Sequence, residues 1–244
     1  MKNTYFLLLT ACAIAFANQT VKADVIADWT FQSSLSTNNI VGAGKTPGST
    51  QSGIVADIGS GTASAFHATA GTAWSIPSGN GSSNSWSANN WSQNDYYQFQ
   101  VSTLGYNSIT ISYDQVGSST GPKTYTLQYS TDGSSYIAFG SSYSVLSSPG
   151  WNPNTASGSA GESFTFDLSS LSALDNLATA YFRVVDLSAT TGGAIGGGNV
   201  GTSGTDRIDN FAVVGSVIAV PEPSTLVLAS LGGLGCLFAL RRKR

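Results

Sequence analysis

Between residues 24 and 220, the side chains best suited to bind a metal ion or to act as acids and bases are carboxylates, from eleven aspartates and one glutamate, Glu162. Calcium requires only oxygen ligands. Four aspartates would supply them if the first and last strands of the fold were neighbours: Asp28, Asp114, Asp206 and Asp209. The alternative is that these aspartates cap turns and keep the chain soluble. The sequence thus indicates no cofactor other than calcium as a candidate.

Catalytic motifs find little support. His67 is the only histidine, and both cysteines, Cys12 and Cys236, lie in apolar end segments, which disfavours zinc and thiolate chemistry. Residues 117–121 match G-x-S-x-G by letter, but Pro122 follows where a nucleophile elbow requires a helix. A carboxylate pair for glycoside hydrolysis is available by number, yet most aspartates stand in turn-like sequence. We therefore predict that the protein is not an enzyme.

Tryptophans provide the strongest candidate for a ligand site. Trp86, Trp91 and Trp151 stand among Ser, Asn, Gln and Asp residues in loop-like sequence. Aromatic rings stack on the apolar faces of sugars, and amides and carboxylates bind the sugar hydroxyls. These residues would then form a carbohydrate-binding site. The alternative is that the three rings cap the ends of the hydrophobic core.

The charge distribution excludes one class of partner. Residues 24–220 contain four basic residues against twelve acidic ones, a formal charge of −8, and the remaining basic residues lie near the two ends. Such an acidic body repels phosphate backbones, so we expect no binding to nucleic acid.

Strand-like segments with period-2 alternation recur through the body and are separated by turn-rich sequence. Two packed antiparallel sheets require such one-sided apolar faces. Asp132-Gly133 indicates a hairpin, and only residues 169–177 suggest a helix, of one or two turns. The sequence predicts an all-β fold, a jelly-roll-like antiparallel β-sandwich spanning residues 24–218, with adjacent first and last strands. The expected strands are 25–31, 62–70, 95–102, 107–114, 124–130, 162–168, 178–187 and 207–215.

The first 23 residues have the pattern of a signal peptide. Lys2 precedes an apolar stretch from Tyr5 to Ala17, and a polar region follows. Small residues favour cleavage after Ala23, with cleavage after Ala17 as the alternative. An uncleaved N-terminal anchor is a further alternative, although the apolar stretch is short for a membrane span.

The last 26 residues, 219–244, combine three features. Two prolines flank Glu222, an uncharged apolar segment at 225–240 reads as a transmembrane helix, and a basic cluster ends the chain. The positive-inside rule places that cluster in the cytoplasm. The prolines prevent the helix from extending back into the body and leave an accessible segment outside the membrane. The basic residues are Arg241, Arg242, Lys243 and Arg244.

These features, in this order, resemble the PEP-CTERM sorting signal. The motif residues are Val220, Pro221, Glu222, Pro223 and Ser224. The resemblance implies that the partner is an exosortase, a membrane-embedded cysteine transpeptidase that cuts near this motif. It also implies a transient inner-membrane intermediate, followed by delivery to the cell surface or extracellular matrix of a Gram-negative bacterium that makes biofilm. A plain C-terminal membrane anchor is the alternative.

The body has a weaker resemblance to β-sandwich domains that often precede this signal. Segments such as Asp28-Trp29-Thr30-Phe31 and Arg207-Ile208-Asp209-Asn210 carry it. It implies a fold and no established activity. Together these observations predict an exported structural protein of the surface or of an exopolysaccharide matrix. The alternative is a carbohydrate-binding module that uses its loop tryptophans on extracellular polysaccharide.

Overall fold

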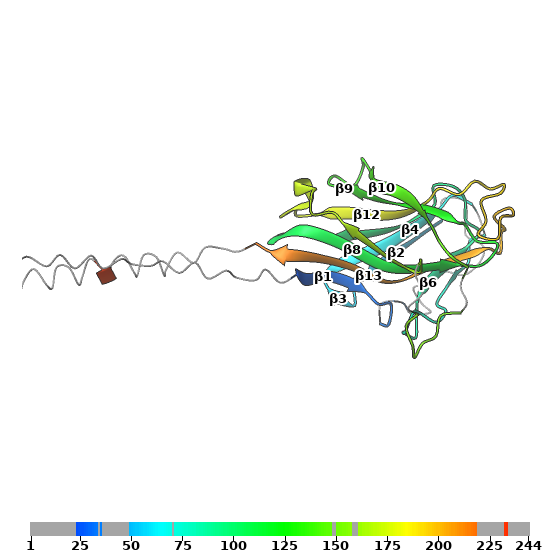
Figure 1. The fold of residues 1–244 in the computed structure, drawn as a ribbon, viewed down its shortest axis with the longest axis horizontal. Helices are drawn as coiled ribbons and strands as arrows, with labels where there is room; N and C mark the ends of the chain where they lie inside the picture. Colours follow the sequence, from blue (N-terminus) through cyan, green and yellow to red (C-terminus); the bar gives the residue numbers. More distant parts are fainter. Residues whose placement is uncertain are drawn as a thin grey trace, which may run out of the picture.

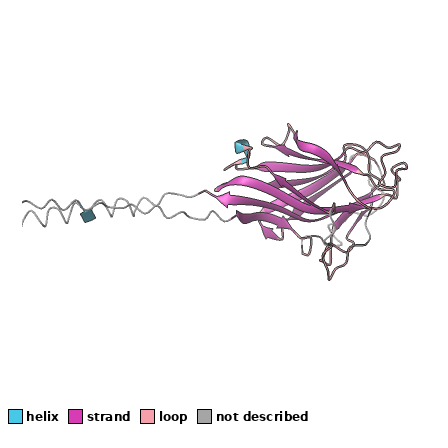
Figure 2. Ribbon diagram, viewed as in Figure 1, coloured by secondary structure: helices cyan, strands magenta, loops and turns pink. Residues whose placement is uncertain are grey.

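The computed structural model describes residues 23–33, 35, 49–69, 71–147, 150–157, 161–218 and 232–233. Within them the body is an antiparallel sandwich of two β-sheets (Figures 1 and 2). The described part of the expected helical segment contains one 3-10 turn, η1 (Ser172–Leu174). The predicted all-β, two-sheet antiparallel architecture is therefore confirmed.

The first sheet, sheet A, has the strand order β11-β8-β13-β1-β3, with β6 also paired to β13 and β5 paired to β6. The central strand β13 hydrogen-bonds to β1, β8 and β6 along different parts of its length. The strands are β1 (Ala23–Trp29), β3 (Ile58–Gly59), β5 (Trp74–Ser75), β6 (Trp86–Asn89), β8 (Tyr106–Gly117), β11 (Ser163–Asp167) and β13 (Thr205–Val217).

The second sheet, sheet B, has the strand order β10-β9-β12-β7-β4-β2. Strand β12 lies between β9 and β7. The strands are β2 (Ser49–Val55), β4 (Gly61–His67), β7 (Tyr96–Val101), β9 (Thr124–Ser130), β10 (Ile137–Ser144) and β12 (Ala180–Asp186).

Period-2 alternation determines which side chains enter the core. In β7, Tyr97, Phe99 and Val101 are buried while the residues between them are half-exposed. Strand β8 buries Ile109 and Ile111 in the same way. The inward faces of the two sheets meet in one core of aromatic and branched residues, because each sheet can remove only one apolar face from water by packing on the other.

The first and last strands are neighbours, as the sequence predicts. Ala23 pairs with Ser216, so β1 begins where β13 ends. Both ends of the body therefore leave the sandwich at the same end, which lies to the left in Figure 1. We call this the proximal end and the opposite end the distal end.

Four expected segments lie outside the described residues, apart from Ala23 and residues 232–233. They are the signal peptide (1–23), the sorting motif (220–224), the membrane helix (225–240) and the basic tail (241–244). Among the residues that the structure does describe, no helix has the length and apolar character needed to cross a membrane.

Candidate functional site

The three tryptophans that the sequence suggested as sugar-binding residues are buried. Trp86 is 0% exposed, Trp91 5% and Trp151 6%. Trp86 stacks on Trp74 with ring centroids 5.5 Å apart, and the indole N–H of Trp91 donates to the carbonyl of Ala88 at 2.9 Å. The three rings therefore do not offer the exposed faces that the predicted sugar-stacking site requires. Trp86 and Trp91 belong to the core cluster, whereas Trp151 packs against Arg207. Large rings surrounded by polar sequence still gain more from burial than from exposure.

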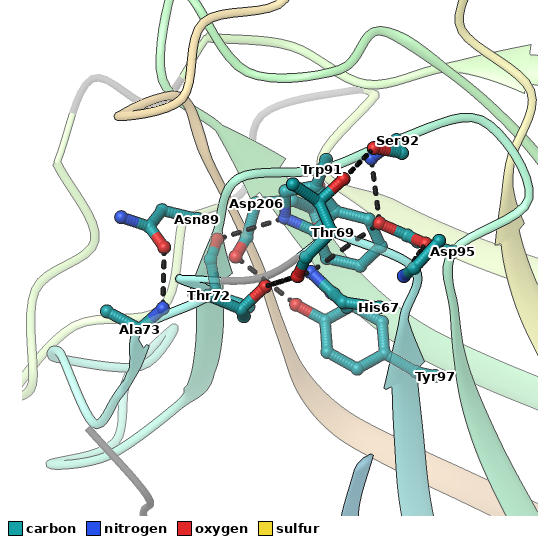
Figure 3. Close-up of polar contacts among 12 residues, drawn as sticks. His67, Thr69, Thr72, Ala73, Asn89, Trp91, Ser92, Asp95, Tyr97 and Asp206 are labelled. Atoms are coloured by element: carbon teal, nitrogen blue, oxygen red, sulfur yellow. Dashed lines mark hydrogen bonds and ion pairs between the residues drawn. The ribbon is translucent and has the colours of Figure 1, made fainter. Parts of the chain in front are cut away.

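His67 lies against the ring of Trp91 (Figure 3). Its ring centroid is 4.2 Å from that of Trp91. Its Nδ1 lies 3.2 Å from the Thr72 hydroxyl and 3.6 Å from Oδ2 of Asp95. Burial lowers the pKa of His67 to about 3 and raises the pKa of Asp95 to about 6. The imidazole is thus neutral at pH 7, and both side chains are sealed from solvent.

Asp95 is held mainly by backbone donors. The amide of Ala68 donates to Oδ1 at 2.8 Å, and the amide of Ser92 donates to Oδ2 at 2.7 Å. These bonds satisfy a carboxylate that closes the loop between β6 and β7. His67 and Asp95 therefore lie side by side and buried inside the distal end.

Asp206 enters the core from β13 and is completely buried. The amide nitrogen of Gln115 donates to both carboxyl oxygens at 3.1 Å, and the hydroxyl of Tyr143 donates to the amide oxygen of Gln115 at 2.8 Å. Burial raises the pKa of Asp206 well above its usual range. This carboxyl group is a member of a buried hydrogen-bond chain.

The four predicted calcium ligands do not converge. Asp209 faces Asp114 across the β13–β8 ladder, but its Oδ2 accepts from the amide of Asn80 and the hydroxyl of Ser82. Asp206 lies in the core, and Asp28 lies on β1 opposite Ala212. Within the described residues no group of three or more His, Cys, Asp or Glu side chains is placed to hold a metal. Pairing of β13 with β1 and β8 places the backbones of these residues close together. Alternation along the strands, however, directs the carboxylates to different faces of the sheet and to different hydrogen-bond partners.

A cleft of about 370 Å³ opens on the outer face of sheet A at the distal end. Its floor follows one cross-strand row, in which Ser75 pairs with Ser87, Ser87 with Arg207, and Arg207 with Val116. Ser118 and Thr205 add hydroxyl groups to the lining. We call it the distal cleft. Its donors and acceptors suit a small polar or anionic group.

Arg207 is the charged residue of the distal cleft. It donates from Nη1 to the carbonyl of Ser78 at 3.1 Å, and its guanidinium lies 4.9 Å from the ring centroid of Trp151. Burial lowers its pKa, while Asp206, Asp209 and Glu162 act in the opposite direction. The sequence gave no sign of the distal cleft, which requires β5, β6 and β13 to be placed side by side.

Comparisons with known proteins concern the two parts of the chain separately. Residues 219–244 match the family model of the PEP-CTERM protein-sorting motif. No curated protein matches the chain in sequence.

Three solved structures illustrate the fold similarity of the body. A cleaved adhesin domain of Lys-gingipain from Porphyromonas gingivalis is 12% identical, over 55% of this chain and 75% of that one, with a TM-score of 0.33. The mannan-recognising carbohydrate-binding module TmCBM27 is 11% identical, over 80% and 99%, with a TM-score of 0.37. The module TmCBM61, solved with β-1,4-galactotriose, is 10% identical, over 69% and 88%, with a TM-score of 0.27. Similarities at this level assign neither a ligand nor an activity.

The match at residues 219–244 begins two residues after the end of β13 at Val217. It covers the Pro-Glu-Pro motif, the apolar segment and the basic cluster that the sequence indicated. The chain therefore carries a PEP-CTERM protein-sorting motif, which implies that it is exported and processed by an exosortase.

Proposed function

We propose that this protein is a non-enzymatic structural component of the cell surface or of an exopolysaccharide matrix, delivered there by an exosortase. The observation that carries the proposal is the pairing of Ala23 with Ser216, which brings both ends of the body to the proximal end. The sorting motif at residues 219–244 follows shortly after the last strand of the body, which ends at Val217. The signal peptide at 1–23, the membrane helix at 225–240 and a jelly-roll topology of the sandwich belong to this proposal.

Both processing events would then spare the body. Cleavage after Ala23 removes one exposed residue of β1 and leaves the inward residue Trp29 in place. Cleavage near Glu222 falls beyond Val217, the last residue of β13. The core cluster between Ile26 and Val213 would remain complete after both cuts. The connection between β12 and β13 lies at the distal end and would then face away from the membrane.

A non-enzymatic role is supported by the position of the most perturbed groups. Among the histidine and aspartate side chains whose pKa burial shifts strongly, five are buried and Asp28 is half-buried. The five are His67, Asp95, Asp186, Asp206 and Asp209. Catalytic groups with shifted pKa values require access to a substrate.

The sorting test uses the producing bacterium. A chain with Pro221, Glu222 and Pro223 all replaced by alanine is compared with the natural chain and with the body variant Ile137→Ala, whose side chain is 57% exposed. Fractions are probed with antibodies against the body. We expect the natural chain and Ile137→Ala to appear shortened in the surface or matrix fraction, and the triple variant to remain uncut in the membrane fraction. The same uncut product is expected when the exosortase is deleted.

The matrix role is tested by deleting the protein. We expect less polysaccharide and less mass retained in the biofilm, restored by the natural chain and not by the triple variant. An unchanged matrix in the deletion strain, although the natural chain is delivered normally to the surface, would refute the structural role and leave the sorting proposal intact.

A further inference from the structure

The outer face of sheet B carries a cross-strand row of polar side chains. Ser64 on β4 pairs with Gln98 on β7, Gln98 with Arg183 on β12, and Arg183 with Gln128 on β9. All four are half-buried, because the residues on either side of each point into the core. Four adjacent strands span about 14 Å, so this row crosses the middle of an open sheet face.

The guanidinium of Arg183 is held flat within this row. Its Cζ lies 3.9 Å from the ring centroid of Tyr96 and 3.5 Å from that of Tyr136. Its Nε donates to the amide oxygen of Gln98 at 2.8 Å, and the hydroxyl of Tyr136 donates to the same oxygen at 2.8 Å. Phe66 stacks on the ring of Tyr96, with centroids 5.6 Å apart. We call Ser64, Phe66, Tyr96, Gln98, Tyr136 and Arg183 the arginine platform.

Within the described residues, the guanidinium of Arg183 forms no ion pair with a carboxylate. This is unusual in a body that has three acidic residues for each basic one. With Nε donating to Gln98, the remaining donors of Arg183 lie on its two Nη atoms. A planar guanidinium presents such donors in a geometry that matches carboxylate and sulfate groups.

A polar hollow continues from the arginine platform along the same face. Thr62 and Gln100 lie two residues along their strands from Ser64 and Gln98, and therefore point to the same side of the sheet. Together with Ser60, Ser102 and Thr179 they line a shallow hollow of about 280 Å³. Hydroxyl and amide groups in such a hollow are suitable partners for sugar hydroxyls.

We propose that the arginine platform and the adjoining hollow bind an acidic polysaccharide. Arg183 binds the anionic group of one sugar, a carboxylate or a sulfate ester, and the hydroxyl and amide groups of the hollow bind neighbouring sugars. A polysaccharide fits better than an acidic peptide, because the hollow is shallow and combines the hydroxyl groups of four residues with apolar surface, as a sugar does. This inference rests on the proposed matrix function for its biological setting, whereas the binding itself does not require sorting.

The test uses the full chain purified in a nonionic detergent, with binding measured by isothermal titration calorimetry. Polygalacturonate oligomers are compared with the same oligomers after methyl esterification, which removes the charge and keeps the sugar. Dextran sulfate and dextran form the second pair. We expect binding to a polyanion that weakens with salt, and at least tenfold weaker binding to its uncharged counterpart. Preference between polygalacturonate and dextran sulfate identifies the anionic group.

Three variants locate the site. Arg183→Gln is expected to weaken polyanion binding at least tenfold. Lys123→Gln removes the same charge from an exposed position outside the platform and is expected to change it less than twofold. Tyr136→Ala removes one stacking ring from the loop before β10 and is expected to weaken binding severalfold. It keeps the proposal testable if Arg183→Gln fails to fold, as judged by circular dichroism.

Equal affinity of folded Arg183→Gln and the natural chain would overturn the proposal. So would equal affinity for charged and esterified oligomers, or binding to neither polyanion. The last result, obtained for a chain that is still sorted to the matrix, would refute the arginine platform and leave the proposed function standing. A chain that binds the polyanion but is not sorted to the matrix would support the arginine platform and contradict the proposed function.

Discussion

The ring of Phe99 lies flat on the ring of Phe211, with centroids 3.5 Å apart and planes 4° apart. Phe99 belongs to β7 in sheet B and Phe211 to β13 in sheet A, so this contact joins the two sheets at the centre of the sandwich. Trp29 packs edge-on against both rings, at 5.0 and 6.0 Å. The three rings make a cross-sheet contact on which the whole body depends.

Replacing Phe211 by alanine should therefore be severely destabilising. Truncation of a fully buried phenylalanine leaves a cavity that close-packed neighbours fill only partly. We expect Phe211→Ala to lower the free energy of unfolding by about 3–5 kcal/mol. Urea unfolding of the full chain in detergent, followed by tryptophan fluorescence, measures it. The control Ile137→Ala, on an exposed side chain, should stay within about 0.5 kcal/mol. A similar small loss in Phe211→Ala would show that the sheets do not depend on this stack.

His67 should remain neutral far below the pH at which histidines normally protonate. It is fully buried against Trp91 and Trp74, and burial lowers its pKa to about 3. Because it is the only histidine, its imidazole ¹⁵N signals are unambiguous in NMR spectra. We expect no titration between pH 8 and pH 4.5 in the folded chain, and a titration near pH 6.5 in 8 M urea. A midpoint near 6.5 without urea would contradict the buried position.

Stability should fall as the pH rises from 5 to 8. Burial raises the pKa of Asp186 and of Asp209 to about 7, and it also raises that of Asp206 well above its usual range. Between the unfolded pKa, 3.8, and these folded values, the folded state holds more protons than the unfolded one, so each such group contributes stability that is lost with increasing pH. One group accounts for at most about 1.4 kcal/mol per pH unit. His67 acts in the opposite direction, but only below its unfolded pKa of about 6.5.

The matched variants isolate the contribution of Asp206. An amide cannot ionise, so Asp206→Asn should lose less stability than the natural chain between pH 5 and 8, as measured by melting temperature. Asp132→Asn is the control, because that exposed carboxyl accepts bonds from Ser134 and Ser135 that lower its pKa. It therefore titrates below the tested range. Identical slopes for Asp206→Asn and the natural chain would mean that Asp206 is ionised in the folded protein.

The features that followed from the sequence are those that depend on local alternation. Tyr97, Phe99 and Val101 were predicted on one face of a strand, and the structure buries all three. The adjacency of the first and last strands was also correct. Alternation reports on which residues face inward, since burial of apolar area dominates the energetics of each strand.

The arginine platform could not be predicted in this way. Gln98 and Arg183 have the same alternating pattern as any solvent-facing residue of a strand. Tyr136 reaches Arg183 from a different part of the chain, 47 positions away. The burial of the tryptophans could not be predicted for a related reason. The polar residues around Trp86 and Trp91 reflect turns and hydrogen bonds to backbone, and they carry no information on whether the rings are exposed.

Glycine-rich sequence near residue 200 is ordered by contact with another loop. The amide of Gly201 donates to the carbonyl of Thr120 at 2.9 Å, and the amide of Gly196 donates to the carbonyl of Ser119 at 2.8 Å. Gly204 lies so close to this loop that an added Cβ would be 2.1 Å from the Thr120 oxygen. Only glycine permits such backbone approach, which is a tertiary requirement that composition does not reveal.

Gly204→Ala should accordingly be destabilising, by about 1–3 kcal/mol, because the two loops must separate to admit a methyl group. Gly198→Ala is the matched control, since a Cβ there meets nothing within 4 Å and the residue does not have a positive φ. That change should be neutral or should stabilise by up to about 1 kcal/mol through the unfolded state. Melting temperatures of the two variants in the full chain measure the difference. If Gly204→Ala and Gly198→Ala melt together, the loop near residue 200 does not pack on residues 118–122 in solution.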